Sequence, residues 1–224
     1  MSIGRFRPPR RIEAFAAGAG FRYNSPKTDR ERQMSRLLRA LGLVFLVASC
    51  AAGSAPRNLE NACALAREKP AYARAMKATA AEWGVPVHVQ MATIYHESRF
   101  IRNARTPRRF ALGFIPAGRQ SSAYGYAQAL DGTWDDYRRE TRNSGARRDR
   151  IEDATDFIGW YMDTSARELG ISKSDATTQY LAYHEGRAGY ARGSHTAKPW
   201  LVSRSREVGR LAARYQQQLE GCRI

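Results

Sequence analysis

The sequence predicts a mainly α-helical protein with one domain behind an N-terminal leader. Apolar residues recur at helical spacing in several segments, and Pro and Gly mark the ends of these segments. We find no β-rich segment long enough to build a sheet. At 224 residues, of which 43% are hydrophobic, the chain is long enough for one domain with a core of its own.

The leader is predicted from residues 34–50. Arg36 and Arg39 precede an apolar run at 40–48, which is too short to span a bilayer because a spanning helix needs about 20 apolar residues. The run has the length of a secretory h-region, although a buried core helix is the alternative. It ends in Val-Ala-Ser-Cys at Cys50, which resembles the lipobox of bacterial lipoproteins.

That resemblance implies a signal peptide at 34–49 and acylation of Cys50. Ala51 rather than Asp follows the cysteine, which by resemblance to lipoprotein sorting favours the periplasmic face of the outer membrane. Residues 50–58 are small and polar and are expected to be a tether. Residues 1–33 are rich in Arg, Gly and Pro without a period, so they are either an extension upstream of the true start at Met34 or a basic disordered segment.

The charge is strongly basic and unevenly spread. The net charge is +16, and residues 1–50 contribute ten basic and three acidic residues to it. A basic chain favours an anionic partner, which can be nucleic acid, anionic lipid or a wall polymer. Because no nucleic-acid-binding motif is present and export is predicted, we expect no nucleic-acid partner.

Helices are expected at 59–68, 70–83, 85–98, 131–140, 151–169, 176–184 and 199–219. Asp131 and Asp175 are predicted N-caps, and Pro86 is predicted as a first helical residue. Residues 99–122 contain Pro and Gly and carry six arginines. This stretch is expected to be a loop, either solvated or forming a rim for an anionic substrate.

Glu97 is the candidate catalytic residue. It falls at the end of the helix at 85–98, whose Val87, Met91, Ile94 and Ser98 are expected to form one buried face. A carboxylate at this end of a helix faces the negative end of the dipole, and apolar neighbours disfavour its charged form further. A carboxyl group that keeps its proton near neutral pH can act as a general acid, whereas an ordinary exposed Glu is the alternative.

Three stretches together suggest a family. They are His-Glu-Ser at 96–98, Ser-Ala-Tyr-Gly-Tyr-Ala-Gln-Ala-Leu-Asp-Gly-Thr-Trp at 122–134, and Tyr-Leu-Ala-Tyr-His-Glu-Gly at 180–186. In this order they resemble the catalytic core of lytic transglycosylases of the soluble-lytic-transglycosylase (SLT) family, which has a lysozyme-like fold. The resemblance covers roughly residues 65–190 and implies a lysozyme-like domain at 59–224.

The resemblance also implies roles for individual residues. Glu97 matches the catalytic acid, and Ser98 matches the neighbouring Ser that orients the substrate's N-acetyl group or the Glu. The family's cleft loop is matched by Gly125, Tyr126, Gln128 and Thr133. Tyr183 matches the family's cleft tyrosine, and its hydroxyl is expected to bond to Glu97 or to the acetamido group of the substrate. Tyr126-Ala127 replaces the family's Leu-Met, and His184-Glu185 replaces its Asn-Ala, which marks a divergent branch. His184 and Glu185 are also expected to bind substrate in the cleft.

The implied reaction needs one carboxyl group. In this family the acid protonates the glycosidic oxygen between N-acetylmuramic acid and N-acetylglucosamine. The C6 hydroxyl of the muramoyl sugar then bonds to C1 of the same sugar and leaves a 1,6-anhydro end. Two alternatives remain: a lysozyme-type hydrolase that uses Asp131 or Glu185 as a second carboxylate, and a non-catalytic wall-binding lipoprotein. An ion pair at a helix end is the other interpretation of Glu185.

The expected partners are peptidoglycan glycan strands and, through Cys50, a membrane. No cofactor and no metal are expected, since His88 and His96 lack the spacing of a metal motif, and the protein is expected to be a monomer. With Cys50 acylated, Cys63 and Cys222 remain. Export favours a disulfide between them over two free thiols.

Overall fold

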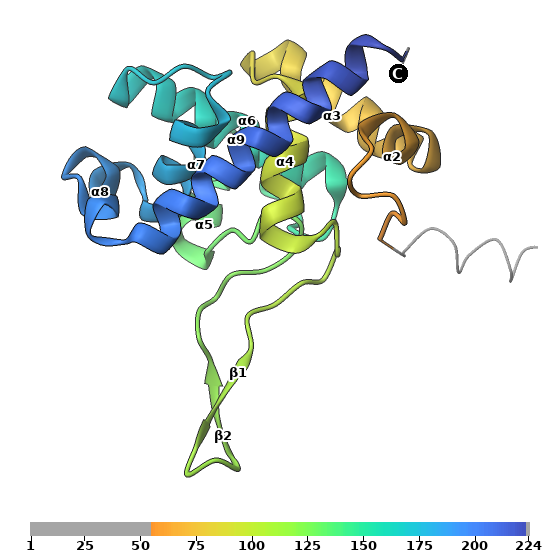
Figure 1. Ribbon diagram of the computed structural model, residues 1–224. Coiled ribbons are helices and arrows are strands. Elements are labelled where there is room, and N and C mark those ends of the chain that lie inside the picture. The colour runs from red at the N-terminus through yellow and green to blue at the C-terminus, as the bar shows by residue number, and fades with distance from the viewer. Residues whose placement is uncertain (1–54, 223–224) are drawn as a thin grey trace, which may run out of the picture. The chain divides into compact units, whose positions relative to one another are not determined.

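A computed structural model of the protein describes residues 55–222, which form a mainly helical fold (Figure 1). The leader, Cys50 and the first part of the predicted tether lie outside the described residues. The elements are α2 (Ala62–Glu68), α3 (Pro70–Trp83), α4 (Val87–Ser98), β1 (Arg108–Ala111), β2 (Ile115–Arg119), α5 (Asp131–Glu140), α6 (Ile151–Leu169), α7 (Ala176–Glu185), α8 (Arg187–Ala191), η1 (Ser194–Ala197) and α9 (Pro199–Glu220).

The helices begin and end where local chemistry requires it. Pro70 opens α3, and Gly84 ends it with a left-handed φ of 70°. The Asp175 carboxylate caps α7 by accepting hydrogen bonds from two backbone amides. The predicted bounds of α3, α5 and α6 are confirmed, but Asp131 is the first residue of α5 and Leu130 occupies the N-cap position. Likewise, Pro86 is the N-cap of α4 rather than its first residue.

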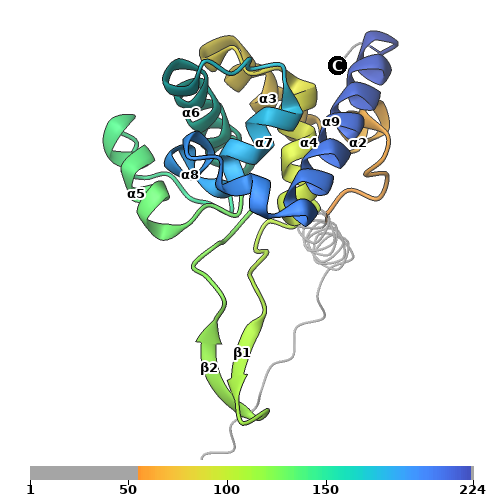
Figure 2. The same cartoon turned by 60° about the vertical axis from the view of Figure 1, so that its left-hand side comes forward.

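Helix α4 runs through the middle of the helical body and packs against α9, α3, α7 and α6 (Figures 1 and 2). The sequence predicts one buried face, but most of its residues are buried and Val87 is only half-buried. Among the buried residues is Gln90, whose amide nitrogen donates to the carbonyls of Met76 and Val85 at 3.0 and 2.8 Å. The candidate Glu97 therefore stands at the end of an element that many neighbours hold in place.

The two ends of the described chain meet at α2 and α9. Cys63 and Cys222 are joined by a disulfide with their Cα atoms 6.2 Å apart. Beside it, the Ala62 amide donates to the Gln218 side chain at 2.7 Å. These links hold the first described helix against the last one.

The expectation that no sheet forms is wrong for one segment. Strands β1 and β2 pair antiparallel within the stretch predicted as a loop, and this hairpin extends away from the helices (Figures 1 and 2). Every residue of both strands is exposed, so neither strand shows the apolar alternation that marks a half-buried strand in a sequence. None of the helices in the described part of the chain is long and apolar enough to cross a bilayer.

Candidate active site

The end of α4 places Glu97. Directly after the helix, Arg99 and Phe100 have left-handed φ angles of 53° and 59°, so the chain turns sharply. The Phe100 ring is buried and stacks on Tyr72 with the centroids 5.9 Å apart. The Arg99 guanidinium lies 4.1 Å from the centroid of the Tyr95 ring. Together these contacts fix the last turn of α4 and the position of Glu97.

The Glu97 carboxyl group faces α7. Burial raises its pKa to about 7, compared with 4.5 for an ordinary glutamic acid. The Tyr180 hydroxyl donates a hydrogen bond to this carboxyl group, which lowers the pKa but by less than burial raises it. Glu97 therefore keeps its proton to a higher pH than an ordinary glutamic acid does, as a general acid requires.

Tyr183 lies near Glu97 but has another hydrogen-bond partner. Its hydroxyl donates to the Ala127 carbonyl at 2.6 Å, which ties α7 to the loop at 125–128. Burial and the negative charge of Glu97 raise the pKa of Tyr183. Of the two partners expected for Tyr183, Glu97 is bonded to Tyr180 instead, and the substrate's acetamido group stays a prediction. Tyr180 lies three residues earlier on the same helix face, and this spacing is the signal that could have identified it.

A cavity of about 190 Å³ lies between this loop and the end of α7. Residues from the loop, α5, α6 and α7 line it: Gln128, Ala129, Leu130, Thr133, Phe157, Tyr161, Tyr183, His184, Glu185 and Gly186. Five residues that the sequence predicted for the cleft thus come together. Glu97 is not among the lining residues. Tyr183 lines the cavity and also lies near Glu97, so it stands between the carboxyl group and the cavity.

Two residues of the loop hold its shape. The Gln128 side-chain nitrogen donates to the carbonyls of Ala104 and Gly125 at 3.0 and 2.8 Å. Gly125 has a φ of 80°, and a Cβ at this position would lie 2.1 Å from the Arg148 carbonyl oxygen. Only glycine fits there, so Gly125 acts through backbone packing and Gln128 is the loop residue that reaches the cavity.

Two predicted substrate contacts point into the protein instead. Ser98 is buried, and its hydroxyl donates to the Ile94 carbonyl of its own helix at 3.3 Å. Tyr126 is also buried, and its hydroxyl pairs with that of Tyr72 at 2.8 Å. Both hydroxyl groups thus have partners within the protein, and substrate binding by Ser98 and Tyr126 stays a prediction. A short motif fixes a position along the chain but not the direction of a side chain.

Glu185 is held in an ion-pair network at the rim of the cavity. The Lys198 ammonium lies 2.8 and 3.0 Å from its two carboxylate oxygens, and the Ser194 hydroxyl donates to the same group. The Lys198 ammonium, helped by this hydroxyl, lowers the pKa of Glu185 to about 2. His184 is exposed, and its ring packs edge-on against Trp200 at 5.1 Å. Glu185 is thus an ionised residue of an ion pair, as the alternative interpretation proposed.

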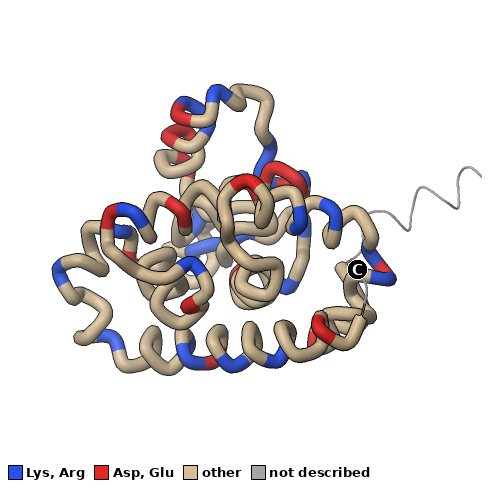
Figure 3. The backbone as a smooth tube through the Cα atoms, turned by 90° about the horizontal axis from the view of Figure 1, so that it is seen from above, with Lys and Arg blue, Asp and Glu red and all other residues tan. Residues whose placement is uncertain are grey.

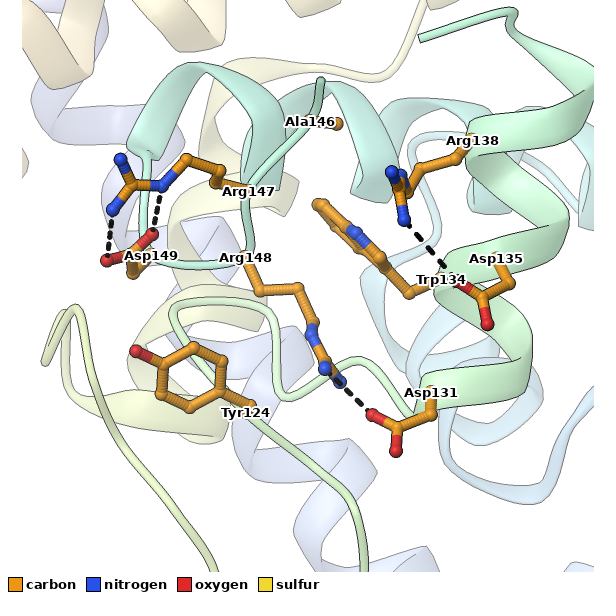
Figure 4. Close-up of a pocket in the computed structure, with 9 residues that line it drawn as sticks. All are labelled: Tyr124, Asp131, Trp134, Asp135, Arg138, Ala146, Arg147, Arg148 and Asp149. Carbon is orange, nitrogen blue, oxygen red and sulfur yellow. Dashed lines mark hydrogen bonds and ion pairs between the residues drawn. The ribbon is translucent and has the colours of Figure 1, made fainter. Parts of the chain in front are cut away.

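A larger cavity of about 590 Å³ is lined by Tyr124, by residues of α5 and by residues 146–149 (Figure 4). Charged side chains dominate its wall, and they pair with one another: Arg148 lies 2.7 Å from Asp131, and Arg147 lies 3.1 Å from Asp149. Asp131 therefore lines this cavity and not the one that holds Gln128 and Tyr183.

His96, next to Glu97, faces a third cavity of about 210 Å³ against α9. Burial, with smaller effects of the neighbouring charges, lowers its pKa to about 4, so its ring is neutral at pH 7. Within residues 55–222, no group of three or more His, Cys, Asp or Glu side chains is placed to hold a metal ion. The proton chemistry of this region therefore centres on Glu97.

Comparison with protein families gives one match. The family described as the transglycosylase SLT domain matches residues 38–222, which is most of the chain. Comparisons with curated proteins and with solved structures find no match.

Proposed function

The chain belongs to the transglycosylase SLT domain family, and from this premise we propose that it cleaves the bond between N-acetylmuramic acid and N-acetylglucosamine and leaves 1,6-anhydro ends. The family itself supports lytic transglycosylase activity on peptidoglycan and a peptidoglycan substrate. The nature of the product and the residues that form it are our proposal.

One observation carries the proposal: the Glu97 carboxyl group has a pKa of about 7, with burial as the main cause and Tyr180 as its hydrogen-bond partner. A group with this pKa can donate a proton and take one back within one catalytic cycle. Two residues predicted for the cleft, Gln128 and Tyr183, line the neighbouring cavity. A glycan strand seated along this loop would present its glycosidic oxygen to Glu97.

In the proposed reaction, protonated Glu97 gives its proton to the glycosidic oxygen as the bond from that oxygen to C1 of the muramoyl sugar breaks. The departing N-acetylglucosamine keeps this proton on its 4-hydroxyl group. The Glu97 carboxylate then removes the proton of the muramoyl C6 hydroxyl, and O6 bonds to C1. Glu97 is protonated again at the end, and no water is consumed.

A lysozyme-type hydrolase is the alternative, and it needs a second carboxylate that is available to water or to the sugar. Glu185 is enclosed, with 3% of its side chain exposed, and is paired with Lys198. Asp131 is paired with Arg148 in the other cavity. These two pairings favour the single-carboxylate reaction over hydrolysis, and the raised pKa of Glu97 argues against a wall-binding protein without activity.

Mass spectrometry of the products from purified peptidoglycan tests the proposal. Anhydromuramoyl ends are lighter than hydrated reducing ends by one water, and we expect them as the main product. Reducing ends as the main product would replace the proposal with a lysozyme-type hydrolase. If the wild-type protein left the glycan strands uncleaved, a wall-binding role without catalysis would be favoured instead.

We also propose that the mature chain starts at an acylated Cys50 and acts as a monomer at the periplasmic face of the outer membrane. The support is in the sequence: Arg36 and Arg39, a short apolar run and a lipobox-like end. Fractionation of cells that express Cys50→Ala tests this location. A variant that is processed and fractionates like the wild type would contradict it.

A further inference from the structure

The hairpin β1–β2 carries an apolar tip that extends away from the helices of residues 55–222 (Figures 1 and 2). Of the seven large hydrophobic residues that are exposed in residues 55–222, four lie within six positions at this tip: Phe110, Leu112, Phe114 and Ile115. Leu112 is 81% exposed and Phe114 is 73% exposed. An exposed apolar cluster of this kind marks a surface that meets a partner or a membrane.

The hairpin has a tight turn that leaves its apolar side chains exposed. The Phe114 amide donates to the Ala111 carbonyl at 3.3 Å, and Leu112 and Gly113 between them have left-handed φ angles of 52° and 78°. Glycine adopts this conformation easily, whereas a leucine there is strained. Leu112 thus has a strained backbone conformation and an exposed apolar side chain, and neither stabilises the fold.

The strands of the hairpin are cationic. Residues 108–119 contain three arginines and no Asp, Glu or Lys. Arg108 on β1 lies directly opposite Arg119 on β2, and like charges in opposed positions destabilise a strand pair. Over the helices, in contrast, acidic residues lie among the basic ones (Figure 3). An anionic partner beside the hairpin would relieve this repulsion.

We infer that the hairpin inserts its tip into the interface of an anionic lipid bilayer. The turn of the hairpin projects farthest from the helices (Figures 1 and 2), and exposed apolar residues lie at it. Arg108 and Arg119 lie behind these residues in the strands, where they would meet the lipid headgroups once the tip is inserted. The tip exposes apolar side chains on a narrow convex loop, which suits a fluid medium better than a flat protein surface. The inference uses only the hairpin, so it is independent of the proposed reaction and of Cys50.

The experiment places an environment-sensitive NBD dye at the tip of the full-length chain. Leu112→Cys carries the dye in a Cys50→Ala background, labelled without reductant because Cys63 and Cys222 are joined. The Cys50→Ala chain without an added cysteine must take up no dye. Since the dye reports only its own surroundings, binding through residues 1–50 does not by itself produce a signal at the tip.

The matched control carries the dye at Gln217→Cys. This exposed residue lies in the last two turns of α9, on the side of the helices opposite the hairpin (Figure 1). With phosphatidylglycerol vesicles we expect a blue shift and brighter emission at the tip, and quenching by lipids that carry nitroxide groups in their acyl chains. Neither change is expected at Gln217→Cys, nor at the tip with phosphatidylcholine vesicles.

The arginines supply a second arm. Each basic residue close to an anionic membrane strengthens binding about fivefold. Replacing Arg108, Arg109 and Arg119 by Gln should therefore lower the ratio of inserted to free tip by about 100-fold. Because all three are exposed strand residues, the helices should keep their circular dichroism spectrum.

Three outcomes would overturn the inference. The first is an unchanged tip spectrum with phosphatidylglycerol vesicles, and the second is an equal change with neutral vesicles. The third is a change in the dye emission at the tip without any vesicles. If purified peptidoglycan caused it, the tip would bind the wall, and if a rising protein concentration caused it, the tip would bind a second copy of the chain.

Discussion

Glu97 and Glu185 occupy equivalent places in two helices but hold their protons very differently. Each lies in the last turn of its helix, Glu97 in α4 and Glu185 in α7, where the helix dipole disfavours a negative charge. Yet the pKa of Glu97 is raised to about 7 and that of Glu185 is lowered to about 2. The shared position therefore does not determine the protonation of either residue.

The difference lies in the groups that other elements bring to each carboxyl. Tyr180 offers Glu97 a neutral hydroxyl in a buried place, so the charged form gains little. Lys198 offers Glu185 an ammonium group at 2.8 Å, so the charged form is strongly favoured. One carboxyl group keeps a proton that it can transfer, and the other serves as an anchor between α7 and the start of α9.

The largest expected effect is the loss of activity in Glu97→Gln. The amide keeps the shape of the side chain but has no transferable proton, and general acid–base catalysis contributes about 10²–10⁴-fold. We therefore expect kcat on purified peptidoglycan to fall by at least about 100-fold. Glu82→Gln, at an exposed position of α3, is the matched control and should keep full activity. Turnover by Glu97→Gln equal to that of the wild type would contradict the assignment of Glu97.

The sequence predicted the helices best where Pro, Gly and polar caps enclose them. Pro70 and Gly84 bound α3, and Gly170 ends α6 with a left-handed φ of 69°. The hairpin was missed because both of its strands are exposed on both faces, so burial imposes no alternation on their sequence. The short α8 and η1 were missed because elements of five and four residues are too short to show a helical period.

The candidate site was predicted in part. The position of Glu97 follows from the helix pattern, but its partner Tyr180 comes from α7 and depends on how the two helices pack. Ser98 and Tyr126 belong to the motifs, yet both side chains turn into the protein. Motifs locate a site along the chain, whereas side-chain direction is decided by packing between elements.

The second prediction concerns stability, where the two carboxyl groups should act with opposite signs. For Glu97, the folded chain holds a proton that the unfolded chain releases between about pH 4.5 and 7, so its contribution to stability falls as pH rises. Removing this group in Glu97→Gln should therefore help most at alkaline pH. The gain in unfolding free energy relative to the wild type should grow by about 2 kcal/mol between pH 5 and pH 8, measured by urea denaturation.

Glu185→Gln should behave in the opposite way. The folded pKa of Glu185 lies below its ordinary 4.5, so its charged form stabilises the fold above that pH and the benefit is lost as pH falls towards about 2. Lys198 is half-exposed and solvent screens the pair, so we expect a loss of about 1–2 kcal/mol at pH 7. This loss should shrink as the pH is lowered. Equal pH dependence of the two variants would show that the carboxyl groups do not differ as described.

The smallest expected effect is a shift of the pH profile in Tyr180→Phe. Because a general acid must be protonated, kcat/KM should fall as the pH rises through about 7, the pKa of Glu97. The Tyr180 hydrogen bond lowers this pKa, and such a bond is worth about 1 kcal/mol net, which corresponds to somewhat less than about one pKa unit. Its removal should therefore shift the alkaline limb of the pH profile to higher pH by about half a pH unit, and it should change the activity at low pH only slightly.

Tyr183→Phe is the matched comparison for this shift. It also removes one tyrosine hydroxyl from α7, but that hydroxyl donates to the Ala127 carbonyl and not to Glu97. We expect it to weaken the hold on the loop at 125–128, with a higher KM and an alkaline limb in the same place as in the wild type. If Tyr183→Phe moved the limb and Tyr180→Phe did not, Tyr183 would be the residue that sets the protonation of Glu97, and the contrast drawn between Glu97 and Glu185 would need a different neighbour to explain it.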